Sequence, residues 1–360
     1  MRVIQTTIPL VGMALALSGC EFSPKQSTQW GPRGTAMAQI QTVAAIQKAA
    51  RENYIPPEPY PLTSRDGPLA TSEYKNVQVL TDLSTEEFNR LMASITSWVA
   101  PTEQGCNYCH NPENMASDEI YQKVVARRML QMTRNINTNW SSHVKQTGVT
   151  CWTCHRGNGV PQYNWSMLPP EPKKLAGNSR GQNQPNPAAG YTSLPRDIFT
   201  PYLLEANSIR VGSQTPYGVG AATPIQAAER TTGLMMHTSK ALGVNCTYCH
   251  NTNNFASWKY STPQRVTAWY GYRMVRNMNK DYIQGLAPVF PAHRKGPMGD
   301  PLKVNCLTCH QGVNKPLGGV SMLPENPSLR GSRFDKVKAP AATETPNTTA
   351  ALAKSVAKGG

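Results

Sequence analysis

Eight of the nine cysteines in this 360-residue chain occur in four copies of the pattern Cys-x-x-Cys-His. The four copies are Cys106/Cys109/His110, Cys151/Cys154/His155, Cys246/Cys249/His250 and Cys306/Cys309/His310. Within one helical turn this spacing presents two thiols, which can form thioethers to porphyrin vinyl groups, and an imidazole, which can bind the haem iron. Redox dithiols and zinc sites also use Cys-x-x-Cys, but neither needs a histidine after the second cysteine in every copy. The pattern therefore predicts four covalently bound c-type haems.

The motifs leave the second axial ligand of each haem iron unassigned. Only three histidines lie outside them, His143, His237 and His293, so at least one of the four haems needs a different ligand. Methionine sulfur is the common alternative and raises the reduction potential. Methionines occur on the helices predicted before the motifs: Met92, Met129 or Met132, Met235 or Met236, and Met274 or Met278. Because a methionine at helical spacing usually fills a core, the residues alone leave the choice open.

Helix signals precede the motifs and predict the elements that would position them. Ser84 and Glu87 have the spacing of a capping box, and the apolar stripe that follows is stopped by Pro101. Further helices are predicted over about 118–136, 224–242 and 263–283, the last two from Thr-Pro start signals. The 30 prolines indicate much irregular backbone. We therefore predict a mainly α-helical multihaem fold with much coil and a possible short strand pair in the central connection.

The motifs form two pairs, which indicates an internal duplication. Ser-Met-Leu-Pro recurs at 166–169 and 321–324, and Met-x-Arg-Asn-x-Asn recurs at 132–137 and 274–279. The predicted organisation is a lipoprotein signal peptide (1–19), a lipid-anchored extended segment (20–79), a two-haem module (80–170), a connector (171–224), a second two-haem module (225–325) and a disordered tail (326–360).

The first twenty residues have the pattern of a bacterial lipoprotein signal peptide. Arg2 supplies a positive start, and the apolar run that ends at Leu17 is too short for an ordinary membrane span. Leu17-Ser-Gly-Cys20 then has the pattern of a lipobox. We predict a thioether-linked diacylglycerol on Cys20, with an uncleaved N-terminal anchor as the alternative. Either form would hold the haem region on the export side of the membrane.

Several stretches extend beyond haem attachment and resemble the tetrahaem cytochrome c subunit of purple bacterial photosynthetic reaction centres. They are Gly-Val-Thr-Cys-Trp-Thr-Cys-His-Arg-Gly at 148–157, Val-Val-Ala-Arg-Arg-Met-Leu at 124–130, Asn-Thr-Asn-Trp at 137–140 with His143, and Ser-Thr-Pro-Gln-Arg at 261–265. The resemblance covers about residues 74–320 and includes the N-terminal lipidated cysteine. It implies three haems with His/Met ligation and one with His/His ligation.

The resemblance also implies the axial pairs. Carried over by motif, they are Met92 with His110, Met129 with His155, Met235 with His250, and His143 with His310. Internal symmetry instead offers Met274 or His293 to the fourth haem, so this pair is the most open. His237, directly after two methionines, is expected to be a packed or solvated neighbour, and His293 is expected at the surface.

The function implied by the resemblance is electron transfer rather than enzymatic catalysis. Such a protein would sit on the periplasmic face of the inner photosynthetic membrane, against the reaction-centre L and M subunits that hold bacteriochlorophyll. It would re-reduce the photo-oxidised special pair and be refilled by a soluble c-type cytochrome or a high-potential iron–sulfur protein. The alternatives are a multihaem reductase and a membrane-tethered quinol-oxidising cytochrome.

The charge distribution adds a feature that the haems do not require. The formal net charge is +15 without a nucleic-acid-binding motif, and we interpret most of it as balance for haem propionates. Residues 71–119 instead hold eight acidic residues against two basic ones. The acidic residues are Glu73, Asp82, Glu86, Glu87, Glu103, Glu113, Asp118 and Glu119. We expect Glu86, Glu87 and Glu103 to dock a basic soluble donor, with a merely solvated helix face as the alternative.

Overall fold

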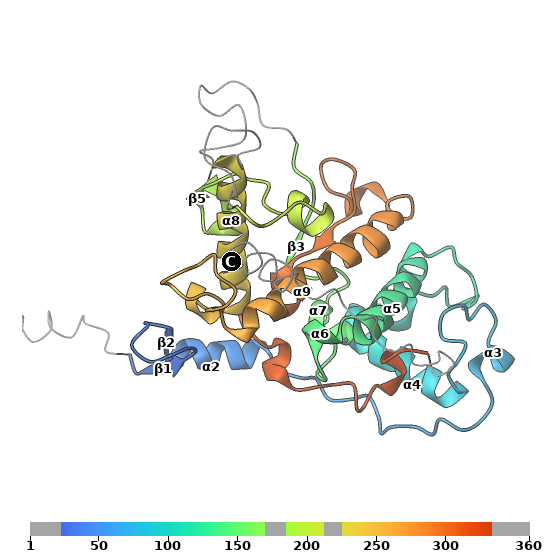
Figure 1. The fold of residues 1–360 in the computed structure, drawn as a ribbon. Coiled ribbons are helices and arrows are strands. Elements are labelled where there is room, and N and C mark those ends of the chain that lie inside the picture. Colours follow the sequence, from blue (N-terminus) through green and yellow to red (C-terminus); the bar gives the residue numbers. More distant parts are fainter. Residues whose placement is uncertain (1–22, 170–184, 212–224, 333–360) are drawn as a thin grey trace, which may run out of the picture. The chain divides into compact units, whose positions relative to one another are not determined.

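The computed structural model describes residues 23–169, 185–211 and 225–332 (Figure 1). Over these ranges the chain is mainly helical with much irregular backbone, and its sheets are three pairs of short strands. This confirms the predicted fold class. The chain divides into two compact units: unit 1 combines Met1–Pro57 with Pro161–Val320, and unit 2 combines Glu58–Val160 with Ser321–Gly360. The predicted signal peptide, Cys20 and most of the predicted tail lie outside the described residues.

Unit 2 is built on two long helices. Its elements are α3 (Ala70–Glu73), α4 (Thr85–Val99), the 3-10 turn η1 (Gly105–Tyr108), α5 (Tyr121–Asn139), α6 (Ser141–Val144), α7 (Cys151–His155) and the 3-10 turn η9 (Pro327–Leu329). The capping box predicted for α4 is confirmed. The Ser84 hydroxyl accepts from the Glu87 amide at 3.2 Å, and the Glu87 carboxylate accepts from the Ser84 amide at 3.1 Å. The helix closes at its C-cap Ala100, directly before Pro101.

Buried polar groups hold distant parts of unit 2 together. Arg134 on α5 donates to Asp82 at 2.8 Å, and both residues are buried. Arg90 on α4 donates to the Glu325 carbonyl at 2.7 Å, which fixes the segment after residue 320 to this helix. Since an unpaired buried guanidinium would be strongly unfavourable, these contacts specify how the segments meet. The buried apolar side chains beneath them include Leu91, Trp98, Leu130, Ile136 and Trp152.

Unit 1 carries all the strands of the described ranges. Its strands are β1 (Lys25–Gln29), β2 (Ala38–Thr42), β3 (Asn164–Trp165), β4 (Pro185–Asn186), β5 (Thr192–Ser193) and β6 (Lys303–Val304). Its α-helices are α2 (Val43–Glu52), α8 (Ile225–Leu242), α9 (Pro263–Asn277) and α10 (Cys306–His310). Its shorter helical segments are η2 (Pro187–Ala189), η3 (Thr200–Leu204), η4 (Cys246–Tyr248), η5 (Met278–Ile283), η6 (Gln284–Leu286), η7 (Ala292–Arg294) and η8 (Pro316–Gly319).

The predicted elements of this unit are present. Helix α8 covers the predicted range, and α9 begins with Pro263 in its first turn. It continues into the π-helical η5, so the helical run ends at Ile283 as predicted. The antiparallel pair β4–β5 is the short strand pair expected in the connector.

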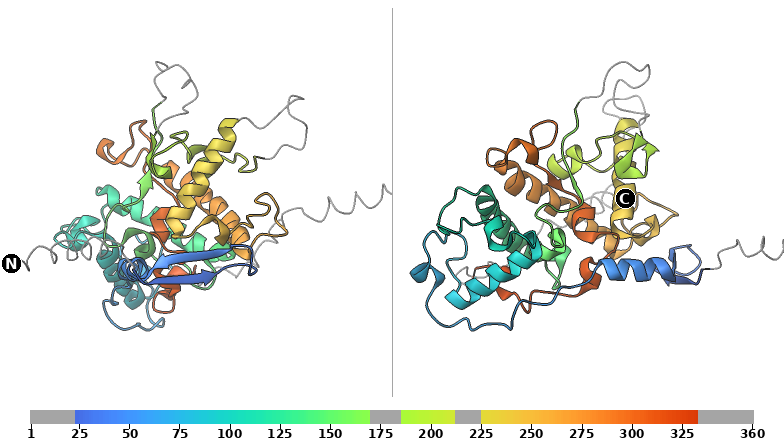
Figure 2. Two further views of the ribbon diagram at one scale, coloured as in Figure 1. Left: turned by 90° about the vertical axis from the view of Figure 1, so that its left-hand side faces the viewer. Right: turned by 180° about the vertical axis from the view of Figure 1, so that it is seen from behind.

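The N-terminal part of unit 1 forms a hairpin and a helix that lack a clear sequence signal. Strands β1 and β2 pair antiparallel, with Lys25 opposite Thr42, and the chain continues directly into α2 (Figure 2). The Thr42 hydroxyl caps α2 by accepting from the Ala45 amide at 3.2 Å. This hairpin and helix lie within the segment 20–79, for which only extended chain was expected.

Glycine allows close packing at the end of α8. Gly243 has a φ of +63°, and a Cβ added there would lie 2.0 Å from the Gly312 carbonyl oxygen. The Gly312 amide in turn donates to the Ala241 carbonyl at 2.9 Å. The chain directly after α10 therefore lies against the last turn of α8.

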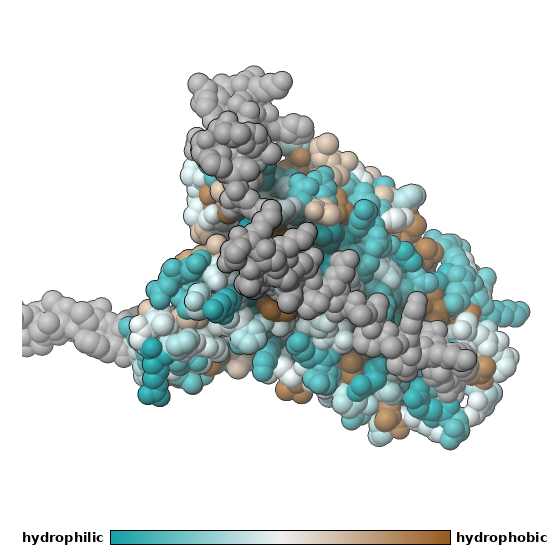
Figure 3. All heavy atoms as spheres, in the orientation of Figure 1, coloured by the Kyte–Doolittle hydropathy of each residue, from teal (hydrophilic) through white to brown (hydrophobic). Residues whose placement is uncertain are grey.

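None of the described helices is long and apolar enough to cross a membrane. The face drawn in Figure 3 is largely hydrophilic, with apolar side chains scattered over it. Scattered exposed apolar residues are ordinary on a protein surface and need no special explanation.

Candidate haem-binding sites

The four motif histidines share one arrangement. In each, ring nitrogen Nδ1 faces a backbone carbonyl a few residues downstream. The distances are 3.1 Å from His110 to Met115, 2.8 Å from His155 to Asn158, 3.0 Å from His250 to Phe255 and 3.0 Å from His310 to Val313. Because a carbonyl oxygen only accepts, the proton must lie on Nδ1, and Nε2 keeps its lone pair for a metal. This orientation of the histidine by a backbone partner is typical of metal-ligating imidazoles.

The local backbone of the motifs repeats in pairs. The first and third motifs form the 3-10 turns η1 and η4, and their histidines bond the carbonyl five residues on. The second and fourth motifs form the short helices α7 and α10, and their histidines bond the carbonyl three residues on. Both of these helices begin with a capping box, and each ends at a left-handed residue followed by glycine. The pairing seen in the sequence therefore extends to hydrogen bonding.

Six of the eight motif cysteines are free thiols: Cys106, Cys109, Cys151, Cys246, Cys249 and Cys306. Burial raises the pKa of Cys109, Cys249 and Cys306 to about 11 and that of Cys151 to about 12. Reactive Cys-x-x-Cys pairs instead lower the pKa of one cysteine, since the thiolate is the nucleophile. Among the described residues no three His, Cys, Asp or Glu side chains converge as in a protein-only metal site. These thiols therefore fit covalent haem attachment better than dithiol exchange or zinc binding.

The other two motif cysteines are in a different state from these six. Cys154 and Cys309 are both disulfide-bonded. The thioethers predicted at these two positions therefore stay a prediction, which requires that the two sulfurs are first reduced. The physical reason is that a cysteine sulfur forms only one bond beyond its Cβ, and a disulfide and a thioether therefore exclude each other. The cysteines that share their motifs, Cys151 and Cys306, are free thiols. Neither Cys154 nor Cys309 therefore forms the disulfide within one motif that is typical of a redox Cys-x-x-Cys pair.

The candidate methionine ligands differ in burial from the methionines that were their alternatives. Met92 on α4, Met129 on α5 and Met235 on α8 are all half-buried. Met132, Met274 and Met278 are buried in the protein core, and Met236 is exposed. A sulfur that binds haem iron must line the surface that the macrocycle covers. The half-burial of Met92, Met129 and Met235 is compatible with this condition.

One of these sulfurs already has a polar partner. The Tyr272 hydroxyl donates to the Met235 sulfur at 3.9 Å and lies 2.8 Å from the Thr238 hydroxyl. Tyr272 is buried on α9, so this contact joins the two helices next to the third motif. The sequence held no signal for it, because the two residues lie on different helices.

The three remaining histidines occupy different environments. His143 is half-buried in the short helix α6. His237 is only 3% exposed and packs edge-on against Phe199, with ring centroids 4.7 Å apart. Burial lowers the pKa of His237 to about 4, so this imidazole is neutral. His293 is exposed in η7.

The N-terminal hairpin docks on the third motif within unit 1. The Asn245 amide, just before Cys246, donates to the Gln39 side chain at 2.8 Å, and the Asn245 side chain donates to the Ala38 carbonyl at 2.8 Å. Trp30 packs edge-on against Tyr248, with centroids 4.9 Å apart. The strand β2 therefore holds the turn that presents Cys246 and Cys249.

The predicted docking carboxylates fall into two groups. Glu86 and Glu103 are exposed. Glu87 is 6% exposed, because it completes the α4 capping box and accepts from Arg65 at 3.0 Å. A carboxylate held in this way contributes to the local field but cannot itself be reached by a partner.

In each motif a histidine oriented for metal binding follows two cysteines, and the fold around the motifs is mainly helical. This combination defines a c-type cytochrome. A family model described as the photosynthetic reaction centre cytochrome C subunit matches residues 21–330. The chain belongs to this family. It is therefore a photosynthetic electron-transfer cytochrome with covalently bound haem.

Relatives of the same description support this assignment. The photosynthetic reaction center cytochrome c subunit of Rubrivivax gelatinosus is 50% identical over 332 residues, which is 91% of this chain and 90% of that protein. The subunit of Thermochromatium tepidum is 48% identical over 328 residues, which is 90% of this chain and 80% of that protein. That of Roseobacter denitrificans is 39% identical over 337 residues, covering 89% and 90%.

Proposed function

We propose that this chain carries four haems and relays single electrons from a soluble periplasmic carrier to the photo-oxidised bacteriochlorophyll pair of a reaction centre. The observation that carries the proposal is the shared histidine arrangement, in which every motif imidazole bonds a carbonyl through Nδ1. Bound haem supplies an iron that alternates between ferrous and ferric states. The chain's residues fix its position and its potential.

Attachment of the second and fourth haems requires one further condition. Cys154 and Cys309 must be reduced before they can form thioethers, because their disulfide-bonded sulfurs are not available for addition to a vinyl group. Their motif partners Cys151 and Cys306 meet this condition as free thiols. Peptide mass mapping of the mature protein should therefore find haem on both cysteines of each motif, and a disulfide that persists at Cys154 or Cys309 would limit that haem to a single thioether.

The proposed axial pairs follow the sequence carry-over. They are Met92 with His110, Met129 with His155, Met235 with His250, and His143 with His310. The half-burial of the three methionines supports their role. Two strong ligands on each iron would leave little to rearrange on oxidation, which suits a relay rather than an enzyme. The paired local geometry of the motifs supports two modules at 80–170 and 225–325.

The proposed location is the periplasmic face of the photosynthetic membrane, beside the L and M subunits. The anchor would be a diacylglycerol on Cys20, five residues before β1 begins at Lys25. Since two acyl chains give stable membrane binding, a spanning helix is not required. On the donor side, Glu86 and Glu103 remain the proposed docking groups, because both are exposed near the first motif in the sequence.

Purification of the full chain from photosynthetic membranes tests this proposal. We expect it to co-purify with a bacteriochlorophyll complex, to carry four haems by intact mass, and to show haem oxidation after a flash. An oxidised spectrum with a high-spin, five-coordinate haem would favour a reductase instead. Isolation without bacteriochlorophyll, and with quinol-dependent haem reduction, would favour the quinol-oxidising alternative.

A further inference from the structure

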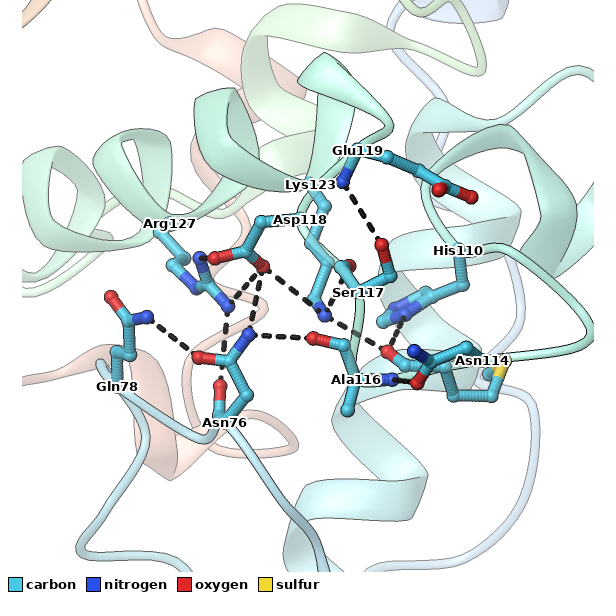
Figure 4. Close-up of polar contacts among 11 residues, drawn as sticks. Asn76, Gln78, His110, Asn114, Ala116, Ser117, Asp118, Glu119, Lys123 and Arg127 are labelled. Carbon is cyan, nitrogen blue, oxygen red and sulfur yellow. Dashed lines mark hydrogen bonds and ion pairs between the residues drawn. The ribbon is translucent and has the colours of Figure 1, made fainter.

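Lys123 and His110 bond the same backbone oxygen. The Lys123 ammonium donates to the Met115 carbonyl at 2.9 Å, and His110 Nδ1 donates to that carbonyl at 3.1 Å. The ammonium also donates to the Ser117 carbonyl at 2.8 Å. Figure 4 shows the Lys123 ammonium and the His110 imidazole directed toward the same loop, which includes Ala116 and Ser117. One oxygen therefore receives a hydrogen bond from the proposed axial histidine and another from a cation.

The charge on Lys123 lies in the protein interior, since the residue is only 8% exposed. Asp118 is 3.4 Å from the ammonium, but it accepts two shorter bonds from Arg127, both 2.8 Å. Asn76 also donates to Asp118 at 2.9 Å. Arg127 therefore provides the main counter-charge for Asp118. The three charged groups together carry a net charge of +1 beside the His110 loop.

Asp118 keeps its negative charge throughout the neutral range. Its pKa is lowered to about 2, chiefly by the hydrogen bonds from Arg127. Asp118 therefore contributes a constant negative charge to this cluster.

Both effects of Lys123 would act on a His110-bound iron in the same direction. A histidine whose Nδ1 donates to a good acceptor becomes a more basic ligand, which favours ferric iron. The Lys123 ammonium also donates to the Met115 oxygen, which makes this oxygen a weaker acceptor for His110 Nδ1. A buried positive charge also opposes the additional charge of the ferric state, in a medium that screens poorly. Each effect raises the reduction potential.

The third motif provides an internal comparison. His250 bonds the Phe255 carbonyl in the same geometry, at 3.0 Å. The cation of that loop, Arg265, donates instead to the Ser257 carbonyl at 2.7 Å and to the Ala256 carbonyl at 3.5 Å. Arg265 therefore does not share the Phe255 oxygen with His250. The shared oxygen distinguishes the first motif from its counterpart in the other unit.

We propose that Lys123 is a positioning residue that raises the reduction potential of the first haem through the Met115 carbonyl. This rests on the proposed function, namely that Cys106 and Cys109 hold a haem whose iron binds His110. Lys123 would act on only one of the four proposed haems, so the other three serve as internal references.

The test is a redox titration of the membrane-bound holoprotein carrying Lys123→Met. This substitution keeps a side chain of similar length and removes its charge. We expect one potential to fall by at least the 59 mV that corresponds to a ten-fold change in the ratio of oxidised to reduced haem. The same haem should be the one altered by Met92→Leu. Lys123→Arg should restore most of the potential, whereas a purely structural role would not depend on charge. Lys75→Met removes an exposed cation of the same unit and should leave all four potentials unchanged.

A second variant keeps the test decisive if Lys123→Met fails to retain haem. Asp118→Asn leaves the bonds of Lys123 to both carbonyls in place and makes the cluster more positive, so the same potential should rise. Four unchanged potentials in Lys123→Met, or no rise in Asp118→Asn, would overturn the proposal. Failure of the proposed function is recognised separately, because peptide mass mapping would then find Cys106 and Cys109 unmodified in the unaltered protein.

Discussion

The Gly157 amide donates a hydrogen bond of 2.8 Å to the Trp98 carbonyl, which ties the second motif to the last turn of α4. Gly312 makes the matching bond of 2.9 Å to Ala241 in the last turn of α8. Each glycine follows a left-handed residue that ends the motif helix, Arg156 in one case and Gln311 in the other. These bonds fix the second motif helix, α7, against α4, which carries Met92, and the fourth motif helix, α10, against α8, which carries Met235.

This tie predicts the effect of replacing the glycines. Gly157 has a φ of +80° and Gly312 a φ of +85°, and a side chain in this region costs about 1–2 kcal/mol. Gly157→Ala and Gly312→Ala should each lower the free energy of unfolding by that amount, measured by guanidinium titration of the holoprotein. Gly285→Ala is the control, since a Cβ there meets nothing within 4 Å and the backbone is not left-handed. Equal stabilities of all three variants would show that the turn adapts freely.

The second prediction concerns the methionine ligands. Replacing Met92, Met129 or Met235 with leucine should keep the covalent haem, lower its reduction potential and remove its share of the near-infrared sulfur–iron absorption. Leucine preserves volume but cannot bind iron. Met132→Leu, in the buried core of unit 2, should leave the band and the potentials unchanged. A leucine variant with an unaltered redox titration would remove that methionine from the proposed ligands.

Tyr272 provides a third prediction, independent of ligand identity at the other haems. Its hydroxyl donates to the Met235 sulfur at 3.9 Å, which draws electron density from the sulfur and so favours ferrous iron. Tyr272→Phe should therefore lower the potential of the third haem while its sulfur–iron band persists. Tyr270→Phe, on the same helix, is the matched control. A potential that stays the same in Tyr272→Phe would indicate that the hydroxyl turns away once haem is bound.

Local signals predicted most of the helices because the chemistry of a helix end is local. Ser84 and Glu87 are three residues apart, and Thr262 directly precedes Pro263, so each start could be read from a few adjacent positions. The same locality made the motif histidines identifiable as candidate ligands. Glu87 shows the limit, because its sequence pattern fits both a capping box and an acidic surface, and the fold places it in the cap with 6% exposure.

The features that could not be predicted depend on partners far away in the chain. The polar strand β2, which pairs with β1, accepts from Asn245, about two hundred residues downstream, through the Gln39 side chain. Their sequences, Lys-Gln-Ser-Thr-Gln and Ala-Gln-Ile-Gln-Thr, carry no clear apolar alternation. Lys123 likewise has no distinguishing context, since its importance comes from a loop carbonyl whose orientation only the folded chain defines.

The state of the motif cysteines was predictable only in part, for the same reason. The spacing within each motif is local and identified all eight residues. The disulfide-bonded state of Cys154 and Cys309 has no local signal, because both belong to motifs with the same spacing as the other two. Whether a sulfur forms a disulfide depends on which other sulfur the fold brings near it, and spacing within a motif does not contain that information.

The fourth prediction separates the candidates for the last ligand. If His143 binds the fourth haem opposite His310, then His143→Met should raise one potential by on the order of 100 mV, given the range that axial ligands control. His293 is exposed in η7 and should be replaceable by alanine without any change in the redox titration. A titration disturbed by His293→Ala and unaffected by His143→Met would contradict the pairing carried over from the sequence.

The last prediction concerns the soluble donor. A basic carrier would be attracted to the exposed carboxylates Glu86 and Glu103, and salt screens such attraction over about 8–10 Å. Re-reduction of the flash-oxidised complex should therefore slow as ionic strength rises. Glu86→Lys and Glu103→Lys should each lower the second-order rate constant several-fold, because they act on encounter, while the haem potentials stay nearly unchanged. Glu205→Lys alters an exposed carboxylate of unit 1 and should have little effect. Rate constants that do not change with ionic strength or with the two charge reversals would show that the donor docks through apolar contacts or at another surface.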